Sequence, residues 1–225
     1  MADYKEFITE LFDSYKCKNK FDILKSLPVY DGEDNIIAYL RPITADYRDT
    51  IKDCAFMMGE WRKQNPSISA STFEITVERT ERWLDNLVIG RIDRLLFMVQ
   101  LLDGTYIGHV GYSSFDFDTK TAEIDSILRG VKGVVPGIMT FALRTLLWWG
   151  KEVARIEHIE LSTDTDNEKS QALYKRVGFV EKSRKALVKV IKEDEVRWDP
   201  ADDPDMPNAE RYSLVMKYVG GQNGE

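Results

Sequence analysis

Tyr174 is the side chain whose setting in the sequence is best suited to chemistry. It stands in the stretch STDTDNEKSQALYKRVGF, which begins with small and acidic residues at Ser162 and ends on Gly178 and Phe179. A tyrosine hydroxyl, with an ordinary pKa of about 10, can donate a proton to a leaving group of similar basicity or hydrogen-bond the charge that develops on it. The alternative is a packing role, because a tyrosine often presents an apolar ring and a polar tip on an amphipathic helix.

A general base is the second group that such proton transfer needs, and the segment TAEIDSILRG at 121–130 offers two carboxylates. In a strand, alternation places Glu123 and Asp125 on the same face. The alternative is a pair of solvated carboxylates, since charged strand residues usually face water. His109 could instead act through a water molecule, although a lone histidine in an apolar strand is more often a core residue, and His158 opens the next strand.

Helices and strands of a mixed fold must position these groups. Apolar residues at three- and four-residue spacing predict helices over 4–15, 46–62 and 75–87. Short apolar or alternating segments predict strands over 36–43, 94–102, 105–115, 121–130, 158–164, 179–191 and 211–219. The sequence therefore predicts one α+β domain, without internal repeats.

Several local signals mark where these elements begin and end. The dipeptide Asp103-Gly104 is typical of a tight hairpin turn between two strands. One helix is expected to begin at Pro136, and another near Thr165, whose spacing to Glu168 is that of a capping box. The acidic, proline-bearing segment 193–210 predicts a loop between the last two strands.

Composition and charge exclude several classes of function. The net charge of -7 argues against nucleic acid, because phosphate binding needs a concentrated basic face. Cys17 and Cys54 lack metal or redox spacing, and no cluster has the spacing of zinc ligands, so no metal is expected. The N-terminus has no apolar signal-peptide core and no apolar run is long enough to span a bilayer, so we expect a cytoplasmic protein without a membrane partner.

The order of elements and two segments between Ile36 and Val219 resemble the GNAT superfamily of acyl-CoA-dependent N-acyltransferases. The stretch containing Tyr174 is similar to the family's pattern Asn-x-x-Ala-x-x-x-Tyr-x-x-x-Gly-Phe. Asn167, Tyr174, Gly178 and Phe179 match, and Ser170 stands in place of the alanine. The resemblance implies that Tyr174 protonates the departing thiolate of CoA or hydrogen-bonds it, that Asn167 contacts the pantetheine arm or acts as a positioning group, and that Ser170 belongs to the cofactor site. An ordinary helix cap remains the alternative for Asn167.

The second segment, RGVKGVVPGIM at 129–139, resembles the family's pyrophosphate loop, which reads Gln or Arg, two residues, Gly, one residue, then Gly or Ala. Aligned on Gly137, it places Lys132 at the basic position but Val135 where the central glycine is expected, and Pro136 removes one donor. The resemblance implies that acetyl-CoA is held by backbone N–H groups at a helix N-terminus. The residues it assigns to the cofactor are Ile127, Leu128, Lys132, Gly133, Val135, Gly137, Ile138, Asn167 and Ser170.

The resemblance also implies a fold and domain boundaries. We expect a central, mostly antiparallel mixed sheet of about seven strands flanked by helices, with an extra N-terminal helix. Residues 1–35 are expected to be a helical extension packed on the body, 36–219 the acetyltransferase domain, and 220–225 a flexible tail.

The activity implied is transfer of an acetyl group from acetyl-CoA to a primary amine by direct attack in a ternary complex, with Glu123 favoured as the base. The acceptor is assigned to Trp61, Arg62, Arg82 and Asp125, with Arg79 and Trp83 nearby, since arginines and aromatic rings suit a nucleotide-linked amino sugar. A protein N-terminus is the alternative acceptor. A non-catalytic acyl-CoA-binding module is the alternative class, and a homodimer is left open.

Overall fold

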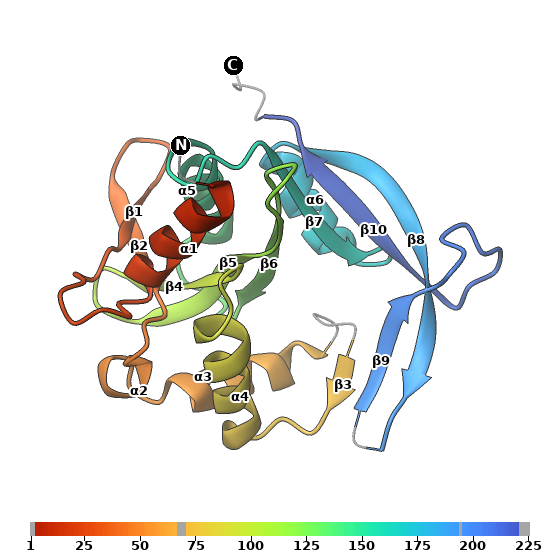
Figure 1. Ribbon diagram of the computed structural model, residues 1–225, viewed down its shortest axis with the longest axis horizontal. Helices are drawn as coiled ribbons and strands as arrows, with labels where there is room; N and C mark the ends of the chain where they lie inside the picture. The colour runs from red at the N-terminus through yellow and green to blue at the C-terminus, as the bar shows by residue number, and fades with distance from the viewer. Residues whose placement is uncertain (1–2, 67–70, 194, 221–225) are drawn as a thin grey trace.

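The computed structural model describes residues 3–66, 71–193 and 195–220, and its strands form one mixed sheet with helices on both faces (Figure 1). The strands are β1 (Leu27–Tyr30), β2 (Ile36–Pro42), β3 (Ser71–Phe73), β4 (Leu95–Leu101), β5 (Tyr106–Asp116), β6 (Thr121–Arg129), β7 (His158–Asp164), β8 (Phe179–Ile191), β9 (Glu195–Pro200) and β10 (Arg211–Tyr218). The helices are α1 (Tyr4–Tyr15), α2 (Tyr47–Thr50), α3 (Cys54–Gln64), α4 (Val77–Trp83), a π-helical turn (Leu84–Ile89), α5 (Ile138–Glu152) and α6 (Glu168–Arg176).

The sheet runs in the order β1-β2-β4-β5-β6-β7-β10-β8-β9-β3. Within the described ranges its ladders are antiparallel except the one that joins β6 to β7, which follow one another through α5. The expected mixed α+β fold with a mostly antiparallel sheet is confirmed. The sheet has 10 strands rather than about seven, because β1, β3 and β9 add to its two edges.

The three additional strands are held by their partners more than by their own sequence. β1 is only four residues long and contains Pro28, and β3 is only three residues long. β9 lies within the segment 193–210 that was expected to be a loop, which is a correction. It pairs with the long strand β8 from Leu187 to Ile191, and β3 then pairs with its other edge.

Alternation along β4 assigns the two faces of the sheet. Leu95, Phe97 and Val99 belong to the core packed by α1 and α5, whereas Leu96 and Met98 belong to the core packed by α2, α3 and the π-helical turn. The view in Figure 1 separates α1 and α5 from α2, α3 and α4 in the same way. Each group of helices therefore buries one face of a single sheet.

The N-terminal segment packs into the first of these cores. Ile8 and Phe12 of α1 are fully buried there, and the indole N–H of Trp149 in α5 donates to the Tyr15 hydroxyl at 2.7 Å. The segment 1–35 thus contributes both a helix and the strand β1. Residues 1–2 and the expected tail after Gly220 lie outside the described residues.

Two helix boundaries differ from those expected. The segment 46–62 is two helices, because Ile51 is extended and Asp53 has a positive φ of 53° between them. The cap of α6 is Asn167, whose side chain accepts a hydrogen bond from the Ser170 backbone, rather than Thr165. Gly178 ends this helix with φ 104°, as expected.

No helix in the described ranges is long and apolar enough to cross a membrane.

Candidate active site

A gap opens between the two parallel strands in the middle of the sheet. β6 and β7 are paired only from Thr121 to Glu123, opposite His158 to Glu160. Beyond these pairs β6 continues along β5 while β7 continues along β10, so the two strands diverge. Their divergence exposes backbone and side chains of both strands to a common cavity.

An irregularity in β6 increases this divergence. Opposite β5, Asp125 pairs with Gly111 and Leu128 with His109, so β6 carries one more residue than its partner between these pairs. The extra residue is accommodated at Ser126, whose φ is 54°. A bulge of this kind bends the strand and changes the direction of the side chains that follow it.

The cavity at the gap has a volume of about 1540 Å³ and is lined from both faces of the sheet. α5 and α6 contribute from one face, and α3, β3 and α4 contribute from the other. The strands between them supply Glu123, Asp125 and Ser162. A ligand on one face can therefore meet a ligand on the other face through the sheet.

Tyr174 lies in the wall of this cavity. Its side chain is 6 % exposed and its ring packs edge-on against Phe179, with centroids 6.3 Å apart. Burial, together with the negative charge of Asp125, raises the pKa of Tyr174 to about 12, while a hydrogen bond with Ser170 opposes the shift. The Tyr174 hydroxyl is therefore protonated throughout the neutral range, in a residue that lines the cavity.

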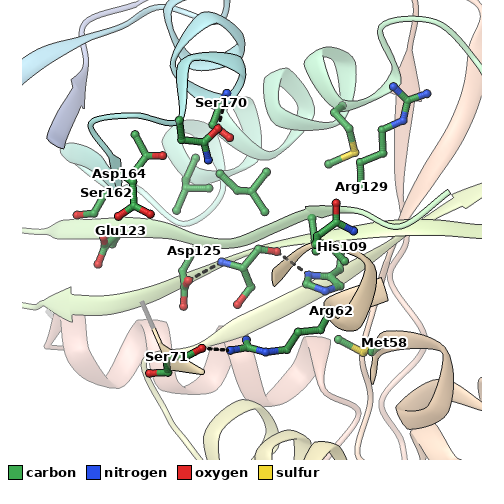
Figure 2. A pocket seen from close by; sticks show the side chains of 18 of the residues that line it. Met58, Arg62, Ser71, His109, Glu123, Asp125, Arg129, Ser162, Asp164 and Ser170 are labelled. Carbon is green, nitrogen blue, oxygen red and sulfur yellow. Dashed lines mark hydrogen bonds between the residues drawn. The ribbon is translucent and has the colours of Figure 1, made fainter. Parts of the chain in front are cut away.

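Glu123 lines the cavity from β6, with Ser162 and Asp164 of β7 on the same side (Figure 2). Burial raises the pKa of Glu123, and the neighbouring carboxylates of Asp125 and Glu160 raise it further, while a hydrogen bond with Ser162 lowers it. A carboxylate whose pKa is moved toward neutrality is better matched to accepting a proton from an ammonium group.

Asp125 is the more tightly held of the two carboxylates. It forms an ion pair with Arg94 and accepts a hydrogen bond from the Ser113 hydroxyl at 3.3 Å. The Ser126 backbone N–H also donates to it. These contacts favour a structural or orienting role for Asp125 and leave Glu123 as the better candidate base.

The two histidines occupy different environments. His109 is buried on β5, where its Nδ1 lies 2.6 Å from the Ser126 carbonyl oxygen, so Nδ1–H donates and Nε2 remains an acceptor. Burial lowers the pKa of His109 to about 4, which keeps the ring neutral. His158 is exposed at the start of β7 and is not among the described residues that line the cavity.

The loop that opens α5 presents unused backbone donors. In the described loop 130–137, the N–H groups of Lys132, Gly133, Val134 and Val135 donate to no described residue. Gly133 and Gly137 have positive φ values of 78° and 74°, which turn the chain into the 15-residue helix α5. Free N–H groups at the positive end of a helix suit a diphosphate, so the loop fits the pyrophosphate of an acyl-CoA.

Most of the residues assigned to the cofactor lie along this side of the cavity. Its wall contains Ile127, Leu128, Lys132, Gly137, Ile138, Asn167 and Ser170. Gly133 and Val135 belong to the same loop but not to the described lining. Asn167 also caps α6, since its Oδ1 accepts from the Ser170 N–H at 3.2 Å.

The residues assigned to the acceptor divide into two groups. Arg62, Arg82 and Asp125 line the cavity, whereas Trp61 is 5 % exposed and is not part of the described lining. The Trp61 indole packs over Gly130 and lies 6.2 Å from the His109 ring, centroid to centroid. Trp61 therefore packs against the chain just after β6 and does not line the cavity.

This packing predicts that Gly130→Ala destabilises the fold. An added Cβ would lie 2.1 Å from the indole of Trp61, which is buried and has no open space to move into. Overpacking of this kind lowers the free energy of unfolding by about 1–3 kcal/mol, measurable by chemical denaturation. Gly32→Ala is the control, because a Cβ there meets nothing within 4 Å. Equal stabilities of the two variants would contradict the packing role of Trp61.

Some residues of the site were not found from the sequence. Arg94 pairs with Asp125, and Phe73, Lys185 and Trp198 line the cavity from β3, β8 and β9. Nothing in their local sequence marks them, because each reaches the site through strand pairing. Ser126 differs from these residues, because it is distinguished by the positive φ of its backbone and not by its side chain.

Comparisons with known proteins agree with this architecture. Residues 38–180 match the acetyltransferase (GNAT) domain family. No curated protein sequence matches the chain.

Three solved structures of similar fold are distant in sequence. A ribosomal L7/L12 alpha-N-protein acetyltransferase, RimL, aligns with a TM-score of 0.61 at 14 % identity, over 87 % of this chain and 94 % of its own. A GCN5-related N-acetyltransferase from Brucella melitensis aligns with a TM-score of 0.60 at 18 % identity, over 87 % and 78 %. A mutant of the spermidine N-acetyltransferase SpeG from Vibrio cholerae aligns with a TM-score of 0.52 at 16 % identity, over 73 % and 88 %.

At these identities the structural likeness shows the fold alone, whereas the family match covers more than half of the sequence. The chain therefore belongs to the GNAT family of acetyltransferases.

Proposed function

We propose that the protein transfers an acetyl group from acetyl-CoA to a primary amine on a small molecule, by direct attack within a ternary complex. The observation that carries this proposal is the cavity that is lined from both faces of the sheet. The loop before α5 carries unused backbone donors, and its Lys132 lines the cavity together with Tyr174 and Glu123. Donor and acceptor can enter from opposite faces and meet between β6 and β7.

The loop before α5 would hold acetyl-CoA by its pyrophosphate, and Asn167, Ser170 and the end of β6 at Ile127 and Leu128 would face the pantetheine arm. When bound, acetyl-CoA supplies an acetyl thioester and, after transfer, a thiolate that needs a proton. Lys132 adds a positive charge beside the free N–H groups of Gly133 and Val134.

Glu123 prepares the acceptor by removing a proton from its ammonium group, which frees the nitrogen lone pair for attack. The raised pKa of Glu123 brings the proton affinity of this carboxylate closer to that of the amine. Tyr174 holds at its Oη the proton that the leaving thiolate would take. Burial raises the pKa of Tyr174 to about 12, so the hydroxyl stays protonated until the thiolate forms. The two groups divide the base and acid roles.

The favoured acceptor is an amino sugar, free or linked to a nucleotide. Arg62 and Arg82 line the α3 and α4 side of the cavity together with the aromatic side chains of Phe73, Trp83 and Trp198. Planar rings pack against sugar and base faces, and guanidinium groups bind phosphate oxygens. This wall is less suited to a polyamine, which would require mainly carboxylates.

A protein N-terminus is the second candidate acceptor. RimL, a ribosomal L7/L12 alpha-N-protein acetyltransferase, shares the fold over 87 % of this chain. Screening nucleotide-linked amino sugars against N-terminal peptides, with acetyl-CoA held constant, separates the two. A module that binds acyl-CoA without catalysis would turn over neither set.

Saturable binding of acetyl-CoA is the first expected result. Isothermal titration should show one site per chain, because the unused N–H groups of the loop before α5 fit the diphosphate of acetyl-CoA. NADH is the control: it also carries a diphosphate but lacks the pantetheine arm that Asn167 and Ser170 would face, so it should give no saturable binding. Absence of saturable binding at millimolar acetyl-CoA would rule out the proposed donor site.

A further inference from the structure

Two arginines from different helices meet at one aromatic ring on the acceptor side of the cavity. The guanidinium carbon of Arg62 in α3 lies 4.6 Å from the ring centroid of Phe73, and that of Arg79 in α4 lies 4.0 Å from it. All three side chains line the cavity. Stacking on the same ring restricts both guanidinium groups and reduces the entropy that they would lose on binding a ligand.

Arg62 is the deeper of the two charges. Its Nη2 donates to the Ser71 carbonyl oxygen at 3.0 Å, and Figure 2 shows the side chain extended across the cavity toward Ser71. Burial lowers the pKa of Arg62, and the charge of Arg79 lowers it further, while Glu195 opposes the shift. A phosphate bound here would receive charge-assisted hydrogen bonds from both guanidinium groups and would offset their mutual repulsion.

The position of this group separates it from the donor loop. Arg62, Phe73 and Arg79 belong to α3, β3 and α4, and α3 covers the opposite face of the sheet from α5. The unused N–H groups that suit a pyrophosphate precede α5. An anion at Phe73 would therefore belong to the acceptor and not to acetyl-CoA.

We propose that Arg62, Arg79 and Phe73 form a subsite for a phosphate ester on the acceptor, so that the substrate class is phosphorylated primary amines. The inference rests on the proposed acetyl transfer and specifies its acceptor. Guanidinium groups present paired N–H donors whose geometry matches phosphate oxygens, which a lysine at the same place could not reproduce. The phosphate can come from a sugar phosphate or from a nucleotide-linked sugar, because both present the same oxygens.

Matched amines test the subsite in turnover. Glucosamine, glucosamine 6-phosphate and a uridine diphosphate-linked amino sugar are compared at saturating acetyl-CoA. At least one phosphorylated amine should exceed glucosamine in kcat/KM by about 10- to 100-fold, and the one preferred identifies the source of the phosphate. Arg62→Met and Arg79→Met should each remove most of this preference through KM, and Arg62→Lys should restore it only in part.

Arg184→Met is the matched control. Arg184 also stacks on an aromatic ring, 5.4 Å from the centroid of Tyr212, but it lies on the exposed surface of β8. Its removal should leave the preference for phosphorylated amines unchanged. Thermal melting of all variants checks that they are folded, and Arg62→Lys keeps the charge if Arg62→Met does not fold.

Binding without catalysis separates failure of the subsite from failure of the proposed reaction. Glucose 6-phosphate and glucose lack the amine, so calorimetric titration of each reports the subsite alone. Binding of glucose 6-phosphate that is at least about 10-fold tighter than that of glucose, and is weakened by Arg62→Met, supports the subsite even if no amine is acetylated. Equal binding of the two sugars, together with equal kcat/KM for all three amines, would overturn the proposed phosphate subsite. Arg62 and Arg79 would then serve only to pack α3 and α4 against Phe73 of β3.

Discussion

Tyr174→Phe should slow acetyl transfer by about 10²- to 10³-fold while acetyl-CoA affinity stays nearly unchanged. The ring and its edge-on contact with Phe179 remain, so the packing of α6 is preserved. The proton held at Oη is lost, and the leaving thiolate must then take a proton from water. Single-turnover acetylation, measured with acetyl-CoA binding on the same variant, separates the chemical step from donor affinity.

Tyr4→Phe is the control for loss of a hydroxyl elsewhere. The Tyr4 hydroxyl donates to the Ala154 carbonyl oxygen at 3.0 Å, remote from the cavity lining. Its removal should lower the melting temperature without changing the single-turnover rate. If Tyr174→Phe behaves in the same way, Tyr174 is a packing residue and its helix serves only to position the donor.

Glu123→Gln should reduce kcat/KM by about 10²- to 10⁴-fold at neutral pH, which is the range expected for losing a general base. Glutamine keeps the shape of the side chain and can still meet the Ser162 hydroxyl, but it cannot accept a proton. The loss should appear in kcat/KM for the amine rather than in acetyl-CoA affinity. Steady-state rates over a range of amine concentrations measure it.

The pH dependence of the same variant gives a second readout. Burial raises the pKa of Glu123, so the activity of the unmodified protein should fall as the pH decreases through a value above that of an ordinary glutamate. Glu123→Gln should lack this acidic limb. If the acidic limb persists in Glu123→Gln, another residue is the base. A persisting limb near pH 4 would indicate His109, because burial lowers its pKa to about 4.

Asp125→Asn distinguishes the two carboxylates of β6. It removes the charge that pairs with Arg94 and leaves that arginine without its partner in a partly buried position, so the stability should fall. The acidic limb should remain, because Glu123 is intact. Loss of the limb in Asp125→Asn alone would exchange the roles assigned to the two residues.

Local sequence signals were sufficient to identify several elements of the fold. Apolar spacing identified α1 and α5, the dipeptide Asp103-Gly104 identified the hairpin between β4 and β5, and Gly178 marked the end of α6. Each depends on backbone preferences within a few residues, which is why pattern alone was sufficient. The segment that contains α6 and Gly178 also carries the family pattern around Tyr174, so the sequence predicted this candidate site residue as well.

Contacts between distant segments of the chain bring together the residues that line the cavity. β9 forms because β8 offers it a partner, and β3 forms because β9 does, although the acidic sequence of 193–210 favoured a loop. The bulge at Ser126 depends on its pairing with β5. Strand pairing joins segments that are distant in the sequence, so it cannot be predicted from the apolar pattern of either strand alone.

Side-chain burial divided neighbours that looked equivalent. Trp61 and Arg62 are adjacent in the last turns of α3, yet the indole packs behind Gly130 while the guanidinium lines the cavity. Arg62 and Arg79 come from different helices, and both guanidinium groups stack on the ring of Phe73 on β3. Sequence reasoning could collect these arginines as candidates, but only the packing of α3, β3 and α4 against one another brings their charges to a single ring.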